Sequence, residues 1–263
     1  MVSDPFESAY FTLRRSHRHS QEFNALAKEF MESESYTSRV DFNAETGLHE
    51  LKVKLVRDFP EDLRGSGSDA IKNIRDALDQ AMSAATFVLT GQRKRHAHFP
   101  FGESADDLEN SLSRRKNRNC RDIPEDLFPA IRYIQPYPHE ADQWALKTLQ
   151  KVTGPHKHGV ALTLGCAPPM PFSMIELIGE DDKALVTMNF LEWDSSEGEA
   201  VVATYGGVDG AMQLGVPFHI AFDHPELKNM PAGDMIYRWG HRTEWVINGL
   251  KKTVEELTAK RSA

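Results

Sequence analysis

Histidines are the first residues of this sequence whose spacing could bind a metal ion. Six of the eleven histidines form three His-x-His pairs: His17 and His19, His96 and His98, and His156 and His158. In a strand, residues i and i+2 face the same side, so such a pair offers two imidazoles to one metal, although a complete site needs further ligands. His156 and His158 are the best pair. We predict no metal or other cofactor, and a His-dependent metal hydrolase stays an alternative.

The other two pairs favour ordinary roles. His17 and His19 fall in a predicted helix, where a two-residue spacing turns the side chains about 200° apart and prevents chelation. His96 and His98 follow directly after basic residues, which indicates a solvated segment. Neither pair is therefore expected to bind a metal.

A basic segment spans residues 91–121, which contain eight Lys and Arg residues and only four acidic ones. Lysine and arginine neutralise nucleic-acid phosphates without reading the base sequence. The chain as a whole has a net charge of −8, and a charge run is commonly a solvated face, so RNA binding is an alternative here. The candidate nucleic-acid-binding residues are Arg93, Lys94, Arg95, Arg114, Arg115 and Lys116.

The sequence gives weaker evidence for a catalytic nucleophile or a phosphate-binding loop. The sequence has no Gly-x-Ser-x-Gly, no P-loop and no Gly-x-Gly-x-x-Gly after a strand. Cys120 has basic neighbours that could lower its pKa, but no assignable base, and we interpret it as a partly exposed lone thiol. Cys120 and Cys166, the two cysteines, are expected to be reduced, in a cytoplasmic protein without a leader peptide.

Helices and a hairpin are predicted in the first 158 residues. Asp4 and Pro5 can begin a long helix that reaches about Met31, and alternation over residues 36–42 and 51–55 predicts a β-hairpin. Residues 65–68, Gly-Ser-Gly-Ser, indicate a flexible break before an amphipathic helix over residues 68–89, the strongest helix signal in the chain. Further helices are expected at residues 104–114, 125–134 and 140–152.

Residues 159–263 change character. Short runs rich in β-branched and aromatic residues predict a meander of antiparallel strands at residues 160–164, 172–178, 184–191, 199–205 and 216–222. An amphipathic stretch at residues 234–257 predicts a closing helix that packs across this sheet. With 40% hydrophobic and 27% charged residues and no run long enough for a membrane span, we expect an α+β protein with parts 1–158 and 159–263.

Four short motifs follow one another between about Tyr36 and Leu164, and they carry a family resemblance. They are residues 68–80 (SDAIKNIRDALDQ), Phe99-Pro100-Phe101, Gln135-Pro136-Tyr137, and His156-Lys157-His158-Gly159. In order and spacing they resemble a group of uncharacterised bacterial proteins. The first motif also resembles the signature of HEPN domains, helical modules common among RNA-cleaving toxins and defence proteins.

The resemblance implies a HEPN-like helical bundle, and a homodimer in which Arg and His of paired subunits flank a phosphate. Arg75 stands at the arginine position, but Gln80 stands where the histidine is expected. A neutral amide cannot act as a general acid or base, so the resemblance favours the scaffold over the activity.

The motifs also suggest a polar cleft between the helical and β parts. We expect its ligand-binding residues to be Arg75, Asp79, Gln80, Gln135, Tyr137, Lys157 and His158. The ordinary alternative is an exposed ion pair of Arg75 with Asp79, worth only about 0.3–0.5 kcal/mol. We therefore expect a non-catalytic or weakly catalytic protein that binds a partner, an anionic ligand or RNA. The enzymatic alternative is an RNA-cleaving protein that uses Arg75 and His158.

Overall fold

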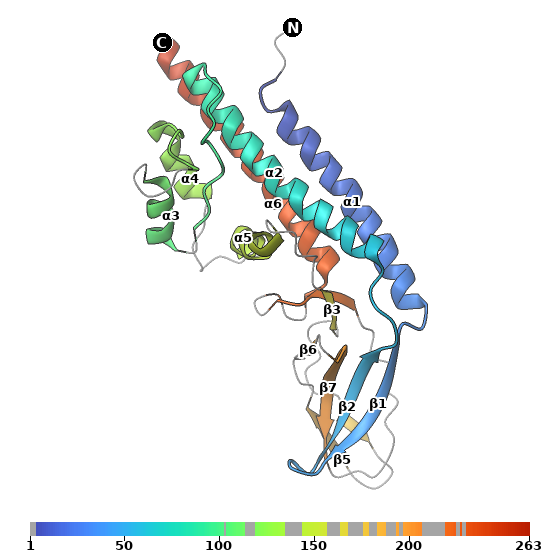
Figure 1. Cartoon of the computed structure of the whole chain (residues 1–263). Helices are drawn as coiled ribbons and strands as arrows, with labels where there is room; N and C mark the ends of the chain where they lie inside the picture. The colour runs from blue at the N-terminus through green and yellow to red at the C-terminus, as the bar shows by residue number, and fades with distance from the viewer. Residues whose placement is uncertain are drawn as a thin grey trace. The chain divides into compact units, whose positions relative to one another are not determined.

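A computed structural model of the chain shows an α+β fold of helices and antiparallel strands (Figure 1). It describes residues 4–102, 104–113, 119–134, 144–156, 164–167, 176–178, 183–187, 193–194, 197–206, 219–224, 227 and 230–263. The expected order of a first helix, a hairpin, central helices, antiparallel strands and a closing helix is confirmed.

The chain forms two compact units, each built from separate stretches of sequence. Unit 1 contains residues 1–21, 66–160 and 235–263, and unit 2 contains residues 22–65 and 161–234. The hairpin therefore belongs with the strands, and most of the closing helix belongs with the helices. The division expected from sequence, between residues 158 and 159, treats each part as one continuous stretch. It therefore cannot show that the hairpin groups with the later strands and that most of the closing helix groups with the earlier helices.

The helices have recognisable starts. Their bounds are α1 Glu7–Glu32, α2 Glu61–Thr90, α3 Ala105–Leu112, a 3-10 turn η1 Glu125–Leu127, α4 Phe128–Ile134, α5 Trp144–His156 and α6 Ala232–Ser262. The Asp4 carboxylate accepts a hydrogen bond from Phe6 N (3.0 Å) before α1, and Ser104 Oγ accepts one from Asp107 N (3.2 Å) at α3. None of these helices, over the residues described, is both long and apolar enough to cross a membrane.

Helix α2 corrects one expectation, because it is continuous through residues 65–68 and begins at Glu61. Acidic residues in its first turn favour a start there, and Leu63 is fully buried. Small residues also permit close packing: Ser66 and Ala70 are buried, and Ser16 Oγ on α1 donates to Ala70 O (3.0 Å). The Gly-Ser-Gly-Ser run is therefore part of a helix and not a flexible break.

The core of unit 1 is apolar and shared among several helices. Ile74, Leu78 and Met82 on α2 are fully buried, as is Trp239 on α6. The Trp239 indole Nε1 donates to Thr148 Oγ1 on α5 (3.1 Å), so its buried polar atom has a partner. The sequence favours packing of the closing helix across the sheet, but from Met235 onward α6 groups with these helices.

Unit 2 is built around an antiparallel sheet. Its strands are β1 Tyr36–Asn43, β2 Leu48–Leu55, β3 Leu164–Ala167, β4 Glu176–Ile178, β5 Lys183–Thr187, β6 Trp193–Asp194, β7 Glu199–Tyr205 and β8 His219–Phe222. The order is β1-β2-β7-β5-β4, β6 also pairs with β7, and β3 pairs with β8 in a second, two-stranded sheet. Four expected strands overlap β4, β5, β7 and β8, while the strand expected at residues 160–164 meets β3 only at Leu164, and residues 160–163 lie outside the described residues. The meander is confirmed from β4 through β5 to β7 but fails at its ends, because β3 pairs with β8 and β7 pairs with β2.

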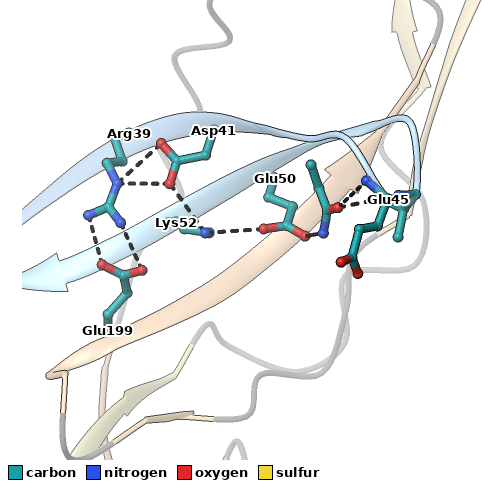
Figure 2. A network of polar contacts seen from close by, with 8 residues as sticks. Arg39, Asp41, Glu45, Glu50, Lys52 and Glu199 are labelled. Carbon is teal, nitrogen blue, oxygen red and sulfur yellow. Dashed lines mark hydrogen bonds and ion pairs between the residues drawn. The ribbon is translucent and has the colours of Figure 1, made fainter.

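The two faces of the β1-β2-β7 sheet differ in chemistry. One face buries Leu51, Val53, Ala200, Ala203 and Tyr205, each at most 3% exposed. The opposite face carries a network in which Arg39, Asp41, Lys52, Glu50 and Glu199 bond across all three strands (Figure 2). Alternation along each strand separates the apolar and charged faces.

Two glycines offer a matched test of this fold. A Cβ added at Gly102 would lie 2.7 Å from Leu108 N and 2.9 Å from its Cα, whereas one added at Gly65, in α2, would meet nothing within 4 Å. We expect Gly102→Ala to destabilise the protein by about 1–3 kcal/mol, because the backbone of α3 must move. Gly65→Ala should stabilise it by roughly 0.5–1 kcal/mol, because alanine favours a helix.

Urea unfolding of both variants measures these changes. A Gly102→Ala protein as stable as the wild type would contradict the close approach of residue 102 to α3. A destabilised Gly65→Ala protein would contradict the continuous helix.

Candidate functional site

The candidate site centres on Arg75, in the middle of α2. Only 17% of its side chain is exposed. The guanidinium carbon lies 3.9 Å from the centroid of the Phe101 ring, a cation–π contact, and Nε lies 3.9 Å from Asp79 Oδ1. The ion pair expected at the surface therefore exists in part, but it is largely buried and too long for a hydrogen bond.

One donor of Arg75 is not matched by an acceptor. Its Nε is buried and has no hydrogen-bond partner among the residues that the structure describes. Burial lowers the pKa of Arg75, while the negative charge of Asp79 acts in the opposite direction. An arginine stays charged even so, and a buried N–H donor without an acceptor is costly.

Asp79 directs its carboxylate mainly at the segment that follows α2. Oδ1 accepts a hydrogen bond from Phe99 N (2.8 Å), and Oδ2 lies 3.1 Å from His98 Nδ1. These bonds fix the start of the Phe99-Pro100-Phe101 motif and with it the ring that stacks on Arg75. Asp79 is thus a positioning residue for the wall of the site.

A second segment, residues 119–122, also holds residues 96–98 in place. His98 N donates to Asn119 O (3.1 Å), and Asp122 N donates to His96 O (3.1 Å). Asp122 also accepts from His96 N through its carboxylate (3.0 Å). The backbone around residues 96–98 is therefore tied both to α2 and to residues 119–122.

Cys120 corrects the expectation of a partly exposed thiol with a lowered pKa. It is 3% exposed, and its Sγ lies 3.6 Å from His98 O, which accepts from the thiol. Burial raises its pKa to about 11, the charge of Asp79 acts in the same direction, and Arg75 opposes both. The basic neighbours in sequence do not control the thiol, because it points into the protein.

Gln80 lies away from Arg75. Its Oε1 accepts hydrogen bonds from Ser8 Oγ (2.8 Å) and Thr12 Oγ1 (3.0 Å), both on α1. Consecutive helix residues point about 100° apart, so Asp79 and Gln80 serve different neighbours. The position at which the resemblance expects a catalytic histidine is used in packing α1 against α2.

The remaining predicted residues are only partly described. Gln135, Tyr137, Lys157, His158, Arg114, Arg115 and Lys116 lie outside the described residues, as does the side chain of His156. Arg93 and Arg95 are exposed, and Lys94 Nζ lies 2.7 Å from Gln92 Oε1. Among described residues, no three His, Cys, Asp or Glu side chains gather as a metal site would require. His17 and His19 lie within helix α1 as expected.

Sequence reasoning missed the partners of Arg75. The Phe101 ring, the Phe99 N–H bond to Asp79 and the burial of Cys120 all involve segments distant from α2 in sequence. The available signal was the Phe-Pro-Phe motif, since an aromatic residue at a fixed distance after an arginine-bearing helix can supply a stacking surface.

The hydrogen bonds of Asp79 make a testable contribution to stability. Asp79→Ala removes the acceptor of the buried Phe99 N–H, and we expect a loss of about 1–3 kcal/mol in the free energy of unfolding. Asp79→Asn keeps an oxygen for that N–H and should lose less. Asp69→Ala, an exposed carboxylate on the same helix, is the control and should stay within about 0.5 kcal/mol of wild type. Equal stability of Asp79→Ala and Asp69→Ala in urea unfolding would contradict this role.

The burial of Cys120 predicts slow alkylation. With a pKa of about 11, roughly one thiol in a thousand is ionised at pH 8. In a Cys166→Ser background, mass spectrometry after iodoacetamide treatment should show little labelling of the folded protein and rapid labelling in urea. Equal rates in both states would show that the thiol is exposed.

Comparisons of the chain with protein-family models, with curated proteins and with solved structures found no match. The resemblance to the motif-bearing bacterial proteins and to HEPN domains therefore stays a prediction from the four motifs. The contacts around Arg75 are the basis on which a function can be proposed.

Proposed function

We propose that this protein is a binding protein with little or no catalytic activity, and that Arg75 binds an anionic group of its ligand. The observation that supports this proposal most strongly is the set of contacts made by the Arg75 guanidinium. The Arg75 side chain is 17% exposed, its guanidinium lies over the Phe101 ring, and its buried Nε has no hydrogen-bond partner among described residues. A buried cation in that state gains most from an anion that brings acceptor oxygens.

The chemistry of arginine indicates the ligand class. Its planar guanidinium presents five N–H donors, which match the paired oxygens of a phosphate or a carboxylate. Asp79 supplies its oxygens to Phe99 N and His98, and its Oδ1 lies 3.9 Å from Arg75 Nε, too far for a hydrogen bond. A phosphate, free or in RNA, is the anion that we propose.

Gln80 supports a binding role over catalysis. Its amide oxygen is used by Ser8 and Thr12, and an amide neither gives nor takes a proton in general acid–base catalysis. A HEPN-like scaffold without its catalytic histidine would fit this proposal. A cytoplasmic location is part of it too, and the free, buried Cys120 thiol supports a reducing compartment.

The two enzymatic alternatives predicted from the sequence each require further residues. The RNA-cleaving alternative needs His158 as a proton-transfer group beside Arg75, and the metal hydrolase needs His156 and His158 as ligands. Neither is supported by the contacts described, because these two side chains lie outside them.

Binding measurements with one charge removed test the proposal. Fluorescence anisotropy with a labelled single-stranded RNA and calorimetry with inorganic phosphate separate the two sources of anion. We expect Arg75→Gln to weaken binding at least about tenfold, because hydrogen bonds to charged groups contribute roughly 1.5–3 kcal/mol. Arg75→Lys should recover part of the affinity. Lys72→Gln, which removes an exposed charge from the same helix, should change it little.

Several outcomes would overturn the proposal. Wild-type protein that binds neither probe, or Arg75→Gln protein that melts normally and binds as well as wild type, would contradict it. Cleavage of the RNA that is lost in both Arg75→Gln and His158→Ala would favour the enzymatic alternative.

A further inference from the structure

The outer edge of β1 is a second feature that could bind a partner, and β1 belongs to unit 2 whereas Arg75 belongs to unit 1. β1 is the first strand in the order β1-β2-β7-β5-β4, so it pairs with β2 on one side. Edge strands offer a row of backbone donors and acceptors to any strand that can approach them.

The register shows which backbone groups point outward. Tyr36 lies opposite Leu55, so Ser35 lies opposite Val56, and Val56 N donates to Ser35 O (2.9 Å). Hydrogen-bonded pairs alternate along an antiparallel ladder, so Thr37, Arg39 and Asp41 direct their N–H and C=O groups at β2. The backbone groups of Ser38, Val40 and Phe42 therefore point away from the sheet, and no partner for them occurs among described residues.

The side chains of this edge are polar on one face and apolar on the other. Arg39 and Asp41 lie on the charged face, with exposed fractions of 46% and 38%. Phe42 lies on the other face and is 62% exposed, although its ring is 5.2 Å from His49, which stacks on Tyr205. Figure 2 shows Arg39 bonded to both Glu199 and Asp41, and the charged network continues from Asp41 through Lys52 to Glu50.

Charges on an edge strand ordinarily discourage pairing. Here their order makes the strand complementary to itself. If two β1 strands pair antiparallel around Val40, Arg39 of each copy lies opposite Asp41 of the other. The outward groups of Ser38, Val40 and Phe42 then face one another, as a ladder requires.

Neighbouring registers are unfavourable. A register centred on Arg39 places two arginines opposite each other, and one centred on Asp41 places two aspartates opposite each other. Shifts by a single residue would place outward backbone groups opposite inward ones. Only the register around Val40 combines long overlap with matched charges.

We propose that β1 is a homodimer interface, in which two copies of the chain pair their β1 strands antiparallel around Val40. The sheet continues from one copy into the other, and the two charged networks join on one face. On the other face, Phe42 of each copy lies diagonal to Val40 of its partner, which covers part of an exposed aromatic ring.

Charge reversal gives a sharp test by sedimentation velocity over a concentration series. Arg39→Asp places aspartates opposite each other, and Asp41→Arg places arginines opposite each other, so each variant alone should dimerise at least about tenfold more weakly than wild type. An equal mixture should form a mixed dimer, because every opposed pair then has opposite charges. Circular dichroism shows that each variant is folded.

The backbone gives an independent test. Val40→Pro removes an N–H that points outward and leaves the ladder with β2 complete, and proline is tolerated on edge strands. It should be folded and monomeric, whereas Val40→Thr, which keeps the N–H, should dimerise as wild type does. Arg75→Gln should also dimerise normally, so failure here is separable from failure of the proposed anion site.

A wild-type protein that stays monomeric throughout the series would overturn this inference. So would a dimer that persists unchanged in Val40→Pro, or single-charge variants that do not associate when mixed.

Discussion

The charge of Arg75 has to be accommodated in a position that water reaches only in part, and the surrounding helical unit is arranged around that constraint. A ring face at 3.9 Å and a carboxylate at 3.9 Å stabilise the cation without hydrogen-bonding it. The same carboxylate holds the segment that carries the ring, through Phe99 N and His98. Asp79 therefore has two roles: its negative charge offsets that of Arg75, and its hydrogen bonds position the segment that carries the Phe101 ring. Arg75 and Cys120 are both largely shielded from water, and this burial lowers the pKa of Arg75 and raises that of Cys120.

Helix α2 can serve two neighbours because consecutive residues diverge around its axis. Gln80 faces α1 and accepts from Ser8 and Thr12, while Asp79 faces residues 98–101. In unit 2, consecutive residues of a strand point to opposite faces of the sheet, which separates a buried apolar face from a charged one. In both units, charged side chains are bonded to segments distant in sequence, so they contribute to the specificity of the fold as well as to its surface.

The periodicity of the sequence was enough to predict the helices, the hairpin and most strands, because amphipathic patterns of this length are determined by which face is buried. It failed at residues 65–68, where small residues serve helix packing and not flexibility. It also could not place the hairpin in the sheet, since nothing local shows that β2 pairs with β7, about 150 residues later. For the site, the motif made Arg75 a candidate ligand-binding residue, and that role stays a proposal. Its burial, the stacking of Phe101 and the pKa of Cys120 depend on tertiary contacts that no local pattern reveals.

Anion binding by Arg75 is reported most directly by its own Nε–H. In a ¹⁵N–¹H spectrum of arginine side chains, with Arg75→Lys used to assign the signal, inorganic phosphate can be titrated while the Arg75 Nε–H resonance is followed. We expect a saturable downfield shift of that proton and slower exchange with water, as a charge-assisted hydrogen bond forms. A resonance that stays in place while phosphate shifts other arginines, or shifts none, would contradict the claim.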